Sequence, residues 1–475
     1  MTHALKEAAR LADCLHFEEA LKILQETADP ESKEEWNRLM ARVLRGLYHS
    51  EEGCRYAREA GSDPKSCLEL AKCLFADGKI REAGNLLQSL DGGNPSPDIC
   101  FSLAAWLAET GDVEMGLDFL HRISVDSLPG GLLKMDCLVL SADLASFQEK
   151  TTDAFQIYNK ALDETAACVP YNWQPLRRML IIHNMADTME QLEQPDEALC
   201  LYQDALREME YQKQRDPHVT DLAGYELELL LSVANCYGNA EEFDTARQYL
   251  SRADSLLADY ESRQLPYFKA RRIYMEGLLQ LNEGNDSQAA DAFRQALDLQ
   301  RDLCRQGRDK PEHAARSAYY LASVLSDAQS QQKLRLYAEA WPVFEKMSAK
   351  EPSFYLASLA DIENERGRLS DCSASAQSHY LKAEKLYEQL LTNNPEDCLA
   401  RESLLTAKIN LFLLSPDAEN ADWLKSELLL LKKSDPNRLF LHTVTAWLHN
   451  SPDCPLELQS WLSDYLRDLG NPYDA

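Results

Sequence analysis

The sequence contains no run of apolar residues long enough to cross a membrane. A membrane-spanning helix needs about 20 such residues, whereas the richest apolar stretches, 227–233 and 428–431, are short and lie between charged residues. The first 20 residues are amphipathic and lack the basic region, apolar run and small-residue cleavage site of a signal peptide. We therefore expect a cytoplasmic protein without a membrane segment.

Motifs of catalysis and of metal binding are also absent. The sequence has no phosphate-binding glycine loop, no HExxH, no GxSxG and no CxxC. His442 and His449 lie seven residues apart, with Cys454 nearby. That spacing places both histidines on one helix face, but we interpret them as packing or surface residues. The sequence predicts no enzymatic activity, no cofactor and no metal site.

Basic residues are scarce. Lys and Arg number 49 against 78 Asp and Glu, so the formal net charge is −29. A surface of this sign repels nucleic acids and anionic membranes, which disfavours both as general partners. Apolar residues make up 45% of the 475 positions, and this is enough to offset chain entropy in a folded core.

Cysteines are plentiful, at 13, but they are odd in number and scattered in spacing, so we expect no disulfide framework. Several lie inside apolar helical stretches, which indicates buried thiols in a reducing compartment. These are Cys67, Cys73, Cys100, Cys137 and Cys236.

A short pattern recurs along nearly the whole chain. A small residue is followed four positions later by a large apolar one and three positions later by another small or apolar one. Examples are Ala20-Leu24-Thr27, Ala154-Tyr158-Ala161, Ala198-Tyr202-Ala205, Ala246-Leu250-Ala253, Ala289-Phe293-Ala296 and Ala383-Tyr387-Leu390. Spacings of four and three place these residues on one helix face. Most copies follow a second amphipathic segment and a turn signal such as Asp77-Gly78 or Glu283-Gly284-Asn285.

Ten or more such copies in series resemble the tetratricopeptide repeat family. The resemblance implies an all-α fold, a right-handed α-solenoid superhelix of about 11–12 antiparallel helix pairs. Early markers lie 33, 30 and 33 residues apart (20, 53, 83, 116), and later ones lie 38 to 51 apart. The central repeats are similar to the long-helix subtype of kinesin light chains and bacterial peptide-sensing regulators, so we expect longer helices there.

The repeat lengths divide the chain into four segments. Residues 1–130 hold short repeats, 131–352 long repeats, 353–437 degenerate repeats with a Ser-rich insert at 370–378, and 438–475 two capping helices. The caps are expected at about 439–450 and 456–469, because a solenoid needs a sealed end. Two stretches, 326–335 and 370–378, interrupt the regular spacing of the repeats, and the second is interpreted as a loop.

The resemblance also implies a binding groove lined by the first helix of each repeat. Applied to the central repeats, it selects polar and aromatic residues suited to a peptide, because Asn pairs with backbone, Arg with carboxylates, and Tyr gives stiff contact area. The predicted groove residues are His183, Asn184, Asp187, Glu190, Glu228, Asn235, Asn239, Arg271, Tyr274, Arg316, Tyr319 and Tyr320. An ordinary hydrated helix face is the competing interpretation.

Charge changes sign within this region. Residues 190–260 hold 16 acids and 5 bases, whereas 263–316 hold 8 acids and 10 bases. Some family members clamp acidic chaperone tails with Lys, Asn and Arg on three consecutive repeats. The matching positions here include Leu5, Ala9, His183, Asp187, Leu231 and Asn235. A clamp of that kind is not expected.

The leading hypothesis is a non-enzymatic scaffold or adaptor that binds a protein segment or partner subunit of basic or mixed charge. One alternative is a peptide- or ligand-sensing regulatory subunit that acts in trans on a partner enzyme. Another is an RNA- or phosphate-binding protein that uses the basic stretch 263–316, which the net charge disfavours.

Overall fold

The chain is helical throughout the part that the computed structural model describes. That part comprises residues 3–27, 32–92, 95–125, 128, 131–148, 150–168, 174–191, 194–349, 351–393, 395, 397–415, 418–434, 438–452 and 454–469. Within these ranges the residues form α-helices and one short 3-10 helix and no β-strand. The predicted all-α solenoid of antiparallel helix pairs is confirmed. No described helix combines the length and the apolar composition that a membrane span requires.

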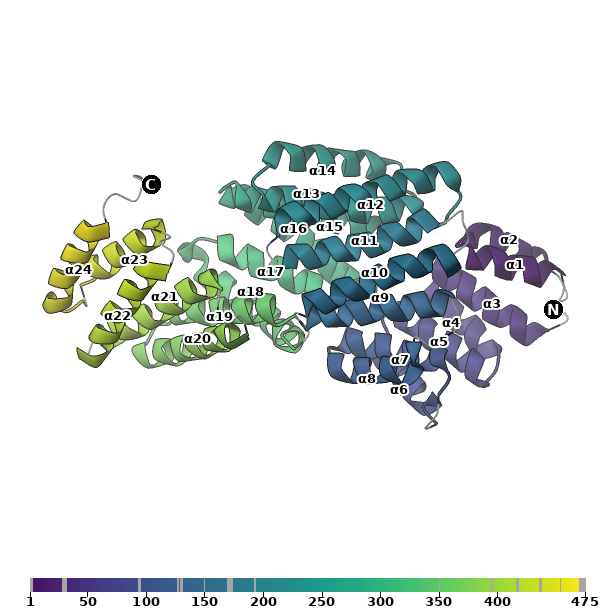
Figure 1. Ribbon diagram of the computed structural model, residues 1–475, viewed down its shortest axis with the longest axis horizontal. Helices are drawn as coiled ribbons and strands as arrows, with labels where there is room; N and C mark the ends of the chain where they lie inside the picture. The colour runs from purple at the N-terminus through teal and green to yellow at the C-terminus, as the bar shows by residue number, and fades with distance from the viewer. Residues whose placement is uncertain are drawn as a thin grey trace. The chain divides into compact units, whose positions relative to one another are not determined.

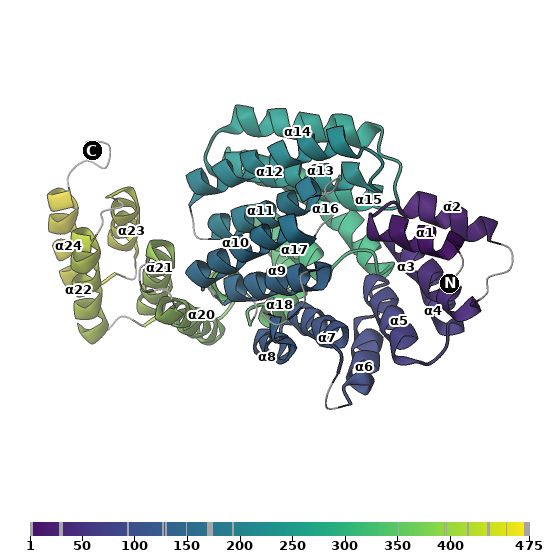
Figure 2. The ribbon, with the colours of Figure 1, turned by 45° about the vertical axis from the view of Figure 1, so that its right-hand side comes forward.

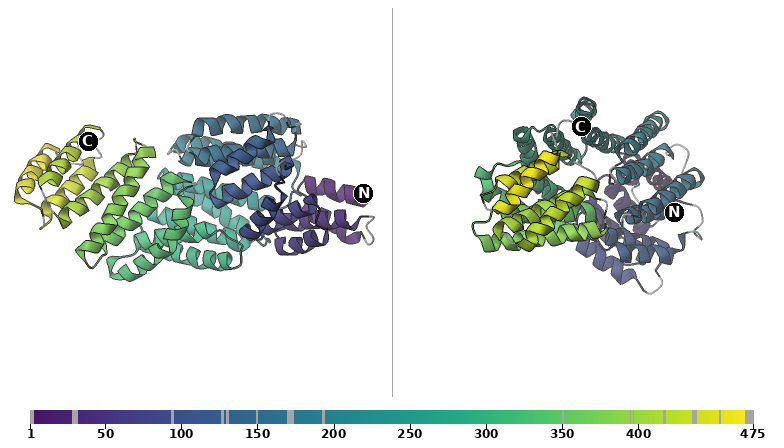
Figure 3. Two further views of the ribbon diagram at one scale, coloured as in Figure 1. Left: turned by 90° about the horizontal axis from the view of Figure 1, so that it is seen from below. Right: turned by 60° about the vertical axis from the view of Figure 1, so that its left-hand side comes forward.

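The chain divides into two compact units, Met1–Ser326 and Asp327–Ala475 (Figure 1). The first unit holds α1 (His3–Asp13), α2 (Phe17–Glu26), α3 (Lys33–Gly46), α4 (Ser50–Glu59), α5 (Pro64–Ala76), α6 (Ile80–Leu90), α7 (Pro97–Thr110), α8 (Val113–Ile123), α9 (Leu132–Phe147), α10 (Thr151–Cys168), α11 (Gln174–Gln191), α12 (Pro195–Arg215), α13 (Leu222–Asn239), α14 (Phe243–Ala258), α15 (Leu265–Asn282), α16 (Asp286–Arg305) and α17 (Pro311–Val324). The second holds η3 (Asp327–Gln329), α18 (Ser330–Met347), α19 (Pro352–Arg368), α20 (Ser373–Asn393), α21 (Cys398–Leu414), α22 (Ala418–Ser434), α23 (Arg438–Asn450) and α24 (Leu456–Leu469). Figure 3 shows the antiparallel pairs from two further sides.

The same hydrogen bond closes the turn inside most helix pairs. A backbone N–H two or three residues past the end of the first helix donates to a carbonyl five residues back, at 2.9 Å from His16 to Leu11 and at 2.8 Å from Asn285 to Gln280. Equivalent bonds join His49 to Leu44, Lys79 to Leu74, Asp112 to Leu107, Lys150 to Ala145, Gln194 to Met189 and Glu242 to Tyr237. This bond belongs to the Schellman helix end, which needs a left-handed residue beside it. Gly78, Gly111 and Gly284 supply it with φ of 75°, 91° and 77°.

The recurrent small and large residues form the core of each pair. The small residues Ala154, Ala198, Ala246, Ala289 and Ala383 are fully buried. Their large partners, among them Tyr158, Tyr202, Phe293 and Tyr387, are at most 1% exposed. Small residues let the two helices approach closely, and the large residue fills the space beside them.

Helix length increases along the first unit as predicted. The second helices α2, α4, α6 and α8 have 10 or 11 residues, whereas α10, α12, α14 and α16 have 18, 21, 16 and 20. The described cysteines are free thiols. Of those predicted to be buried, Cys67 is half-exposed, and the other four are buried.

The expectation of a loop at 370–378 needs correction. Only residues 370–372 of the stretch 370–378 lie outside helix, because α20 begins at Ser373. Ala376 and Tyr380 continue the core spacing toward Ala383, and all three are buried. Within 326–335, helix α18 begins at Ser330. The small polar residues of 370–378 made the apolar helix face that includes Ala376 difficult to recognise from the sequence.

The C-terminal helices lie where the sequence placed them. Helices α23 and α24 match the expected 439–450 and 456–469 within one residue. On α24, Leu458, Leu462, Tyr465 and Leu469 are buried in the core of the second unit. Residues 470–475 lie outside the described ranges, and the division into four segments by repeat length stays a prediction.

One face of the first unit is built from first helices. Each first helix from α1 to α13 packs against the next first helix along the chain, from α1 with α3 to α13 with α15. Successive second helices pack less extensively on one another than the first helices do. The first helices therefore lie on the inside of the curve (Figure 2). We call the surface formed by α11, α13, α15 and α17 the inner face.

Candidate functional site

The twelve predicted groove residues all lie on first helices of the first unit. Four are on α11, three on α13, two on α15 and three on α17. The structure brings most of them into three groups, which differ in chemistry.

The first group surrounds the hydroxyl of Tyr202. This oxygen lies 2.6 Å from a carboxylate oxygen of Asp187 and 2.6 Å from one of Glu190. One phenolic proton can serve only one of these bonds. Burial raises the pKa of Glu190 to about 7, and the nearby charge of Asp187 adds to the effect. When Glu190 is protonated, its own proton serves the second bond.

Neighbouring side chains extend this group. The amide of Asn235 donates to Glu190 at 3.2 Å. His183 lies 3.0 Å from the hydroxyl of Ser232, and its ring centroid is 5.8 Å from that of Tyr202. These bonds join α11 to α12 and α13. The group therefore holds the three helices together and also places polar atoms on the inner face.

Asp187 belongs to a recurrent lock that the sequence analysis missed. In three pairs, a buried tyrosine of the second helix donates to an aspartate of the first helix. The bonds are Tyr158 to Asp143 at 2.5 Å, Tyr202 to Asp187 at 2.6 Å and Tyr387 to Asp361 at 2.6 Å. Each aspartate directly follows the small residue of its first helix, as Ala142-Asp143, Ala186-Asp187 and Ala360-Asp361. That dipeptide was the signal available in the sequence.

Asn184 on α11 takes part in the lock of the preceding helix pair, α9 and α10. Its amide donates at 3.0 Å to the Asp143 oxygen that accepts from Tyr158. Asn184 and Asp187 therefore have structural partners within the chain. Asn184 joins two neighbouring repeats, and Asp187 joins the two helices of its own pair. Their place in a binding groove stays a prediction.

The second group joins α13 to α15. Arg271 pairs with Glu228, and the hydroxyl of Tyr267 lies 3.2 Å from Glu228. The Arg271 and Glu228 side chains are 21% and 29% exposed, so this ion pair is largely shielded from water but reachable from the inner face. Burial lowers the pKa of Arg271. Tyr267, four residues before Arg271 on one helix face, was not predicted.

His313 and Asp309 extend the second group, and the sequence analysis missed both. The Asp309 side chain is only 2% exposed and lies 2.5 Å from Nδ1 of His313. The His313 ring lies 5.9 Å from the ring of Tyr267. Proximity across α15 and α17 could not be read from residues more than 40 positions apart.

The third group is aromatic. The Tyr320 ring stacks on Phe293 with centroids 5.5 Å apart, and Tyr274 lies 6.1 Å from Tyr320. Tyr319 packs edge-on against Tyr320 at 5.2 Å.

Asn239 lies apart from these groups, at the end of α13, where it accepts a bond from Asn282 at 3.4 Å. Arg316 is half-buried on α17.

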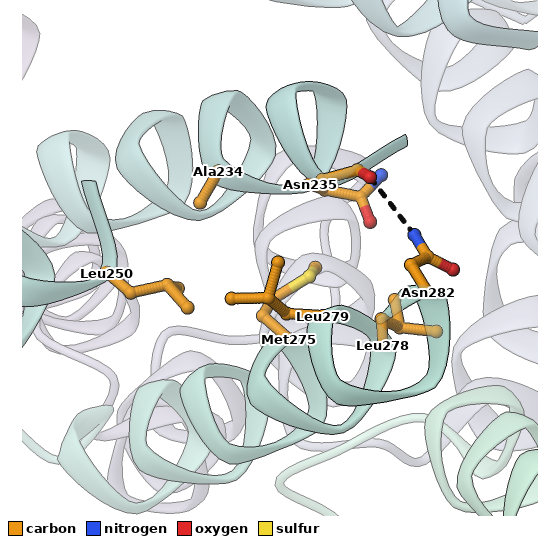
Figure 4. A pocket seen from close by; sticks show the side chains of 8 residues that line it. Ala234, Asn235, Leu250, Met275, Leu278, Leu279 and Asn282 are labelled. Atoms are coloured by element: carbon orange, nitrogen blue, oxygen red, sulfur yellow. Dashed lines mark hydrogen bonds between the residues drawn. The ribbon is translucent and has the colours of Figure 1, made fainter. Parts of the chain in front are cut away.

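A small cavity lies beside the first group, between α13, α14 and α15. Its volume is about 10 Å³, and its lining is mostly apolar. Figure 4 shows Leu250, Met275 and Leu279 around it, with Asn235 and Asn282 at one end. This volume holds one water molecule at most, so the cavity takes no organic ligand.

Many bases in 263–316 already have acidic partners. Arg272 bonds both Asp254 and Glu276, at 2.7 to 2.8 Å. Further pairs are Arg271–Glu228, Arg294–Asp291, Arg301–Asp298, Arg305–Asp302 and Lys310–Glu109.

The described residues do not gather three or more His, Cys, Asp or Glu side chains that could hold a metal ion. His449 lies 2.8 Å from the Ser463 hydroxyl.

The fold and these groups define a helical-repeat protein of tetratricopeptide-like architecture. No model of a known protein family matches the sequence, and no curated protein matches it. Solved structures show similar folds. One is a Rap protein complexed with competence and sporulation factor, 14% identical over 84% of this chain and 100% of that chain, with a TM-score of 0.44.

Two further structures are similar over comparable lengths. Aspartyl phosphate phosphatase F from Bacillus subtilis is 12% identical over 83% of this chain and 96% of that chain, with a TM-score of 0.46. The human IFIT1 dimer with m7Gppp-AAAA is 16% identical over 90% and 95%, with a TM-score of 0.42. Similarities this distant assign neither a partner nor an activity to this chain.

Proposed function

We propose that this chain is a non-enzymatic scaffold that binds an extended protein segment along its inner face. The observation that carries the proposal is the Glu228–Arg271–Tyr267 group, which presents charge and an aromatic ring on two adjacent first helices at partial exposure. Beside it, Tyr274, Tyr319 and Tyr320 add stiff contact area.

The chemistry of the inner face suits a peptide better than a small molecule. Tyrosine combines apolar area with a polar tip, and arginine can pair with a carboxylate or stack on a ring. The adjacent cavity of about 10 Å³ excludes an organic ligand. The net charge of −29 favours a partner of basic or mixed charge.

The two other hypotheses fare differently. A regulatory subunit that senses a peptide would use this same inner face, so it is a refinement of the proposal. An RNA- or phosphate-binding role is less well supported, because the net charge of −29 repels a polyanion.

The test is selection from a displayed library of random dodecapeptides, followed by affinity measurements on the enriched sequences. Arg271→Gln should weaken binding about tenfold or more, since a charge-assisted contact is lost. Tyr320→Leu should weaken it less. Arg252→Gln is the matched control, because Arg252 is exposed on the second helix α14.

Circular dichroism must show that each variant is folded before its affinity is compared. Binding that survives both Arg271→Gln and Tyr320→Leu but is lost in Arg252→Gln would place the site on the opposite face and contradict the proposal. Failure to enrich any peptide with the wild-type chain would also count against it.

A further inference from the structure

Turns of the first three helix pairs touch loops about 200 residues further along the chain. In each case the residue in the left-handed conformation makes the contact. The Leu15 carbonyl accepts from the Thr220 N–H at 2.9 Å, and the Tyr48 carbonyl accepts from the Arg263 guanidinium at 3.1 Å. In the third, a Cβ atom added to Gly78 would lie 2.9 Å from the Gly307 carbonyl oxygen.

The contacts follow a regular register. The turn residues 15, 48 and 78 are 33 and 30 positions apart, whereas their partners 220, 263 and 307 are 43 and 44 apart. One short repeat therefore faces one long repeat at each step. Figure 2 shows α1 and α2 next to the ends of α13 and α15, where the first contact lies.

Side chains reinforce the first contact. The Phe17 N–H, which opens α2 and has no partner within its helix, donates to the Thr220 hydroxyl at 2.9 Å. His16 lies 2.8 Å from a carboxylate oxygen of Asp216, and both side chains are at most 15% exposed. Glu18 also bonds the Thr220 hydroxyl.

The second and third contacts are reinforced in the same way. The Tyr48 hydroxyl donates to Asp221 at 2.6 Å, and the Tyr260 hydroxyl bonds the other oxygen of the same carboxylate. Lys310, three residues past Gly307, pairs with Glu109 of α7 at 2.9 Å.

A series of contacts leads from these loops to the inner face. Next to Lys310, the buried Asp309 carboxylate holds His313, whose ring packs near Tyr267. Tyr267 in turn bonds Glu228, the partner of Arg271. The loop that meets Gly78 and Glu109 is therefore joined to the proposed binding group by neighbouring side chains.

We propose that the three turn–loop contacts form a latch that closes one superhelical turn of the first unit, and that its closure is coupled to the Glu228–Arg271–Tyr267 group. The meaning of the coupling for ligand binding rests on the proposed function, whereas the latch itself does not. Because coupling is reciprocal, a peptide that binds better in the closed state will tighten the latch by the same factor.

Hydrogen exchange of the ligand-free full-length chain tests the latch. Gly78→Ala forces a Cβ against the Gly307 carbonyl. The control is Gly284→Ala. Gly284 occupies the same position in its turn, with φ of 77° compared with 75° for Gly78, but a Cβ there would have no neighbouring atom within 4 Å. We expect amide exchange in 15–18, 216–222 and 307–310 to rise about tenfold in Gly78→Ala and to stay unchanged in Gly284→Ala. Equal exchange in the two variants would overturn the latch.

A second pair of variants keeps the test valid if Gly78→Ala fails to fold. Thr220→Val preserves shape but removes the acceptor of the Phe17 N–H, and Thr245→Val on α14 is its control. Faster exchange at 15–18 in the first variant alone supports the latch, and no difference overturns it.

The coupling has its own readout. Tyr267→Leu, which removes the ring beside His313 and the bond to Glu228, should speed exchange at 307–310 about threefold without changing the equivalent turn at 283–285. Unchanged exchange at 307–310 would overturn the coupling. Since no ligand is added, failure of the peptide selection would contradict the proposed function and leave these results intact.

Discussion

The hydroxyl of Tyr202 on α12 lies 2.6 Å from the carboxylate of Glu190 on α11. The two residues are 12 positions apart, on the two helices of one pair, and the tyrosine is fully buried. Ionising the carboxyl group of Glu190 in this position costs free energy, because burial disfavours the charged form. The contact therefore makes the stability of the first unit depend on pH.

The first prediction concerns that dependence. The pKa of Glu190 is raised from about 4.5 to about 7 by burial. Between these values the folded chain keeps a proton that the unfolded chain releases, so stability falls as pH rises from 4.5 to 7. Glu190→Gln should remove up to about 3 kcal/mol of this loss. Urea unfolding at pH 5 and pH 8 measures it, and the exposed Glu197→Gln should show no such difference.

The second prediction concerns the tyrosine–aspartate lock. Tyr387→Phe removes one buried hydrogen bond to Asp361 without changing the packed ring. We expect a loss of about 1–3 kcal/mol, because a partly buried carboxylate loses its donor. Tyr211→Phe is the control, since Tyr211 is 53% exposed. Equal unfolding midpoints for Tyr387→Phe and wild type would show that the lock does not contribute.

The third prediction concerns the Arg271–Glu228 pair. A double-mutant cycle of Arg271→Gln and Glu228→Gln should give a coupling energy of about 1–2 kcal/mol, because both side chains are largely shielded from water. The exposed pair Arg294–Asp291 should give at most about 0.5 kcal/mol. A coupling energy no larger than that of the exposed pair would count against a shielded polar group on the inner face.

The fourth prediction contrasts two helical glycines. A Cβ on Gly238 would make ordinary contact with Leu279 at 3.5 Å, so Gly238→Ala should stabilise the chain by about 0.5–1 kcal/mol. A Cβ on Gly277 would lie 2.6 Å from the buried ring of Phe293, so Gly277→Ala should destabilise it by about 1–3 kcal/mol. Thermal unfolding of both variants measures the difference, and effects of the same sign would contradict the packing around Gly238 and Gly277.

Local patterns were sufficient to predict the helix pairs and their core. Ala198 and Tyr202 are buried as their spacing of four required, because that spacing is a property of one helix. The same rule placed the capping helices α23 and α24 correctly. It failed at 373–378 because small polar residues concealed the apolar face that Ala376 and Tyr380 begin.

The sequence by itself determined the fold class, the repeat positions and the helices that carry the inner face, since each of these depends on residues within about one repeat of each other. Only the tertiary structure decided which side chains meet. It paired Arg271 with Glu228, gave Asp187 a structural role, and brought Leu15 to Thr220. The contact of Leu15 with Thr220 depends on how the angles between successive helix pairs accumulate, and no local pattern in the chain encodes that sum.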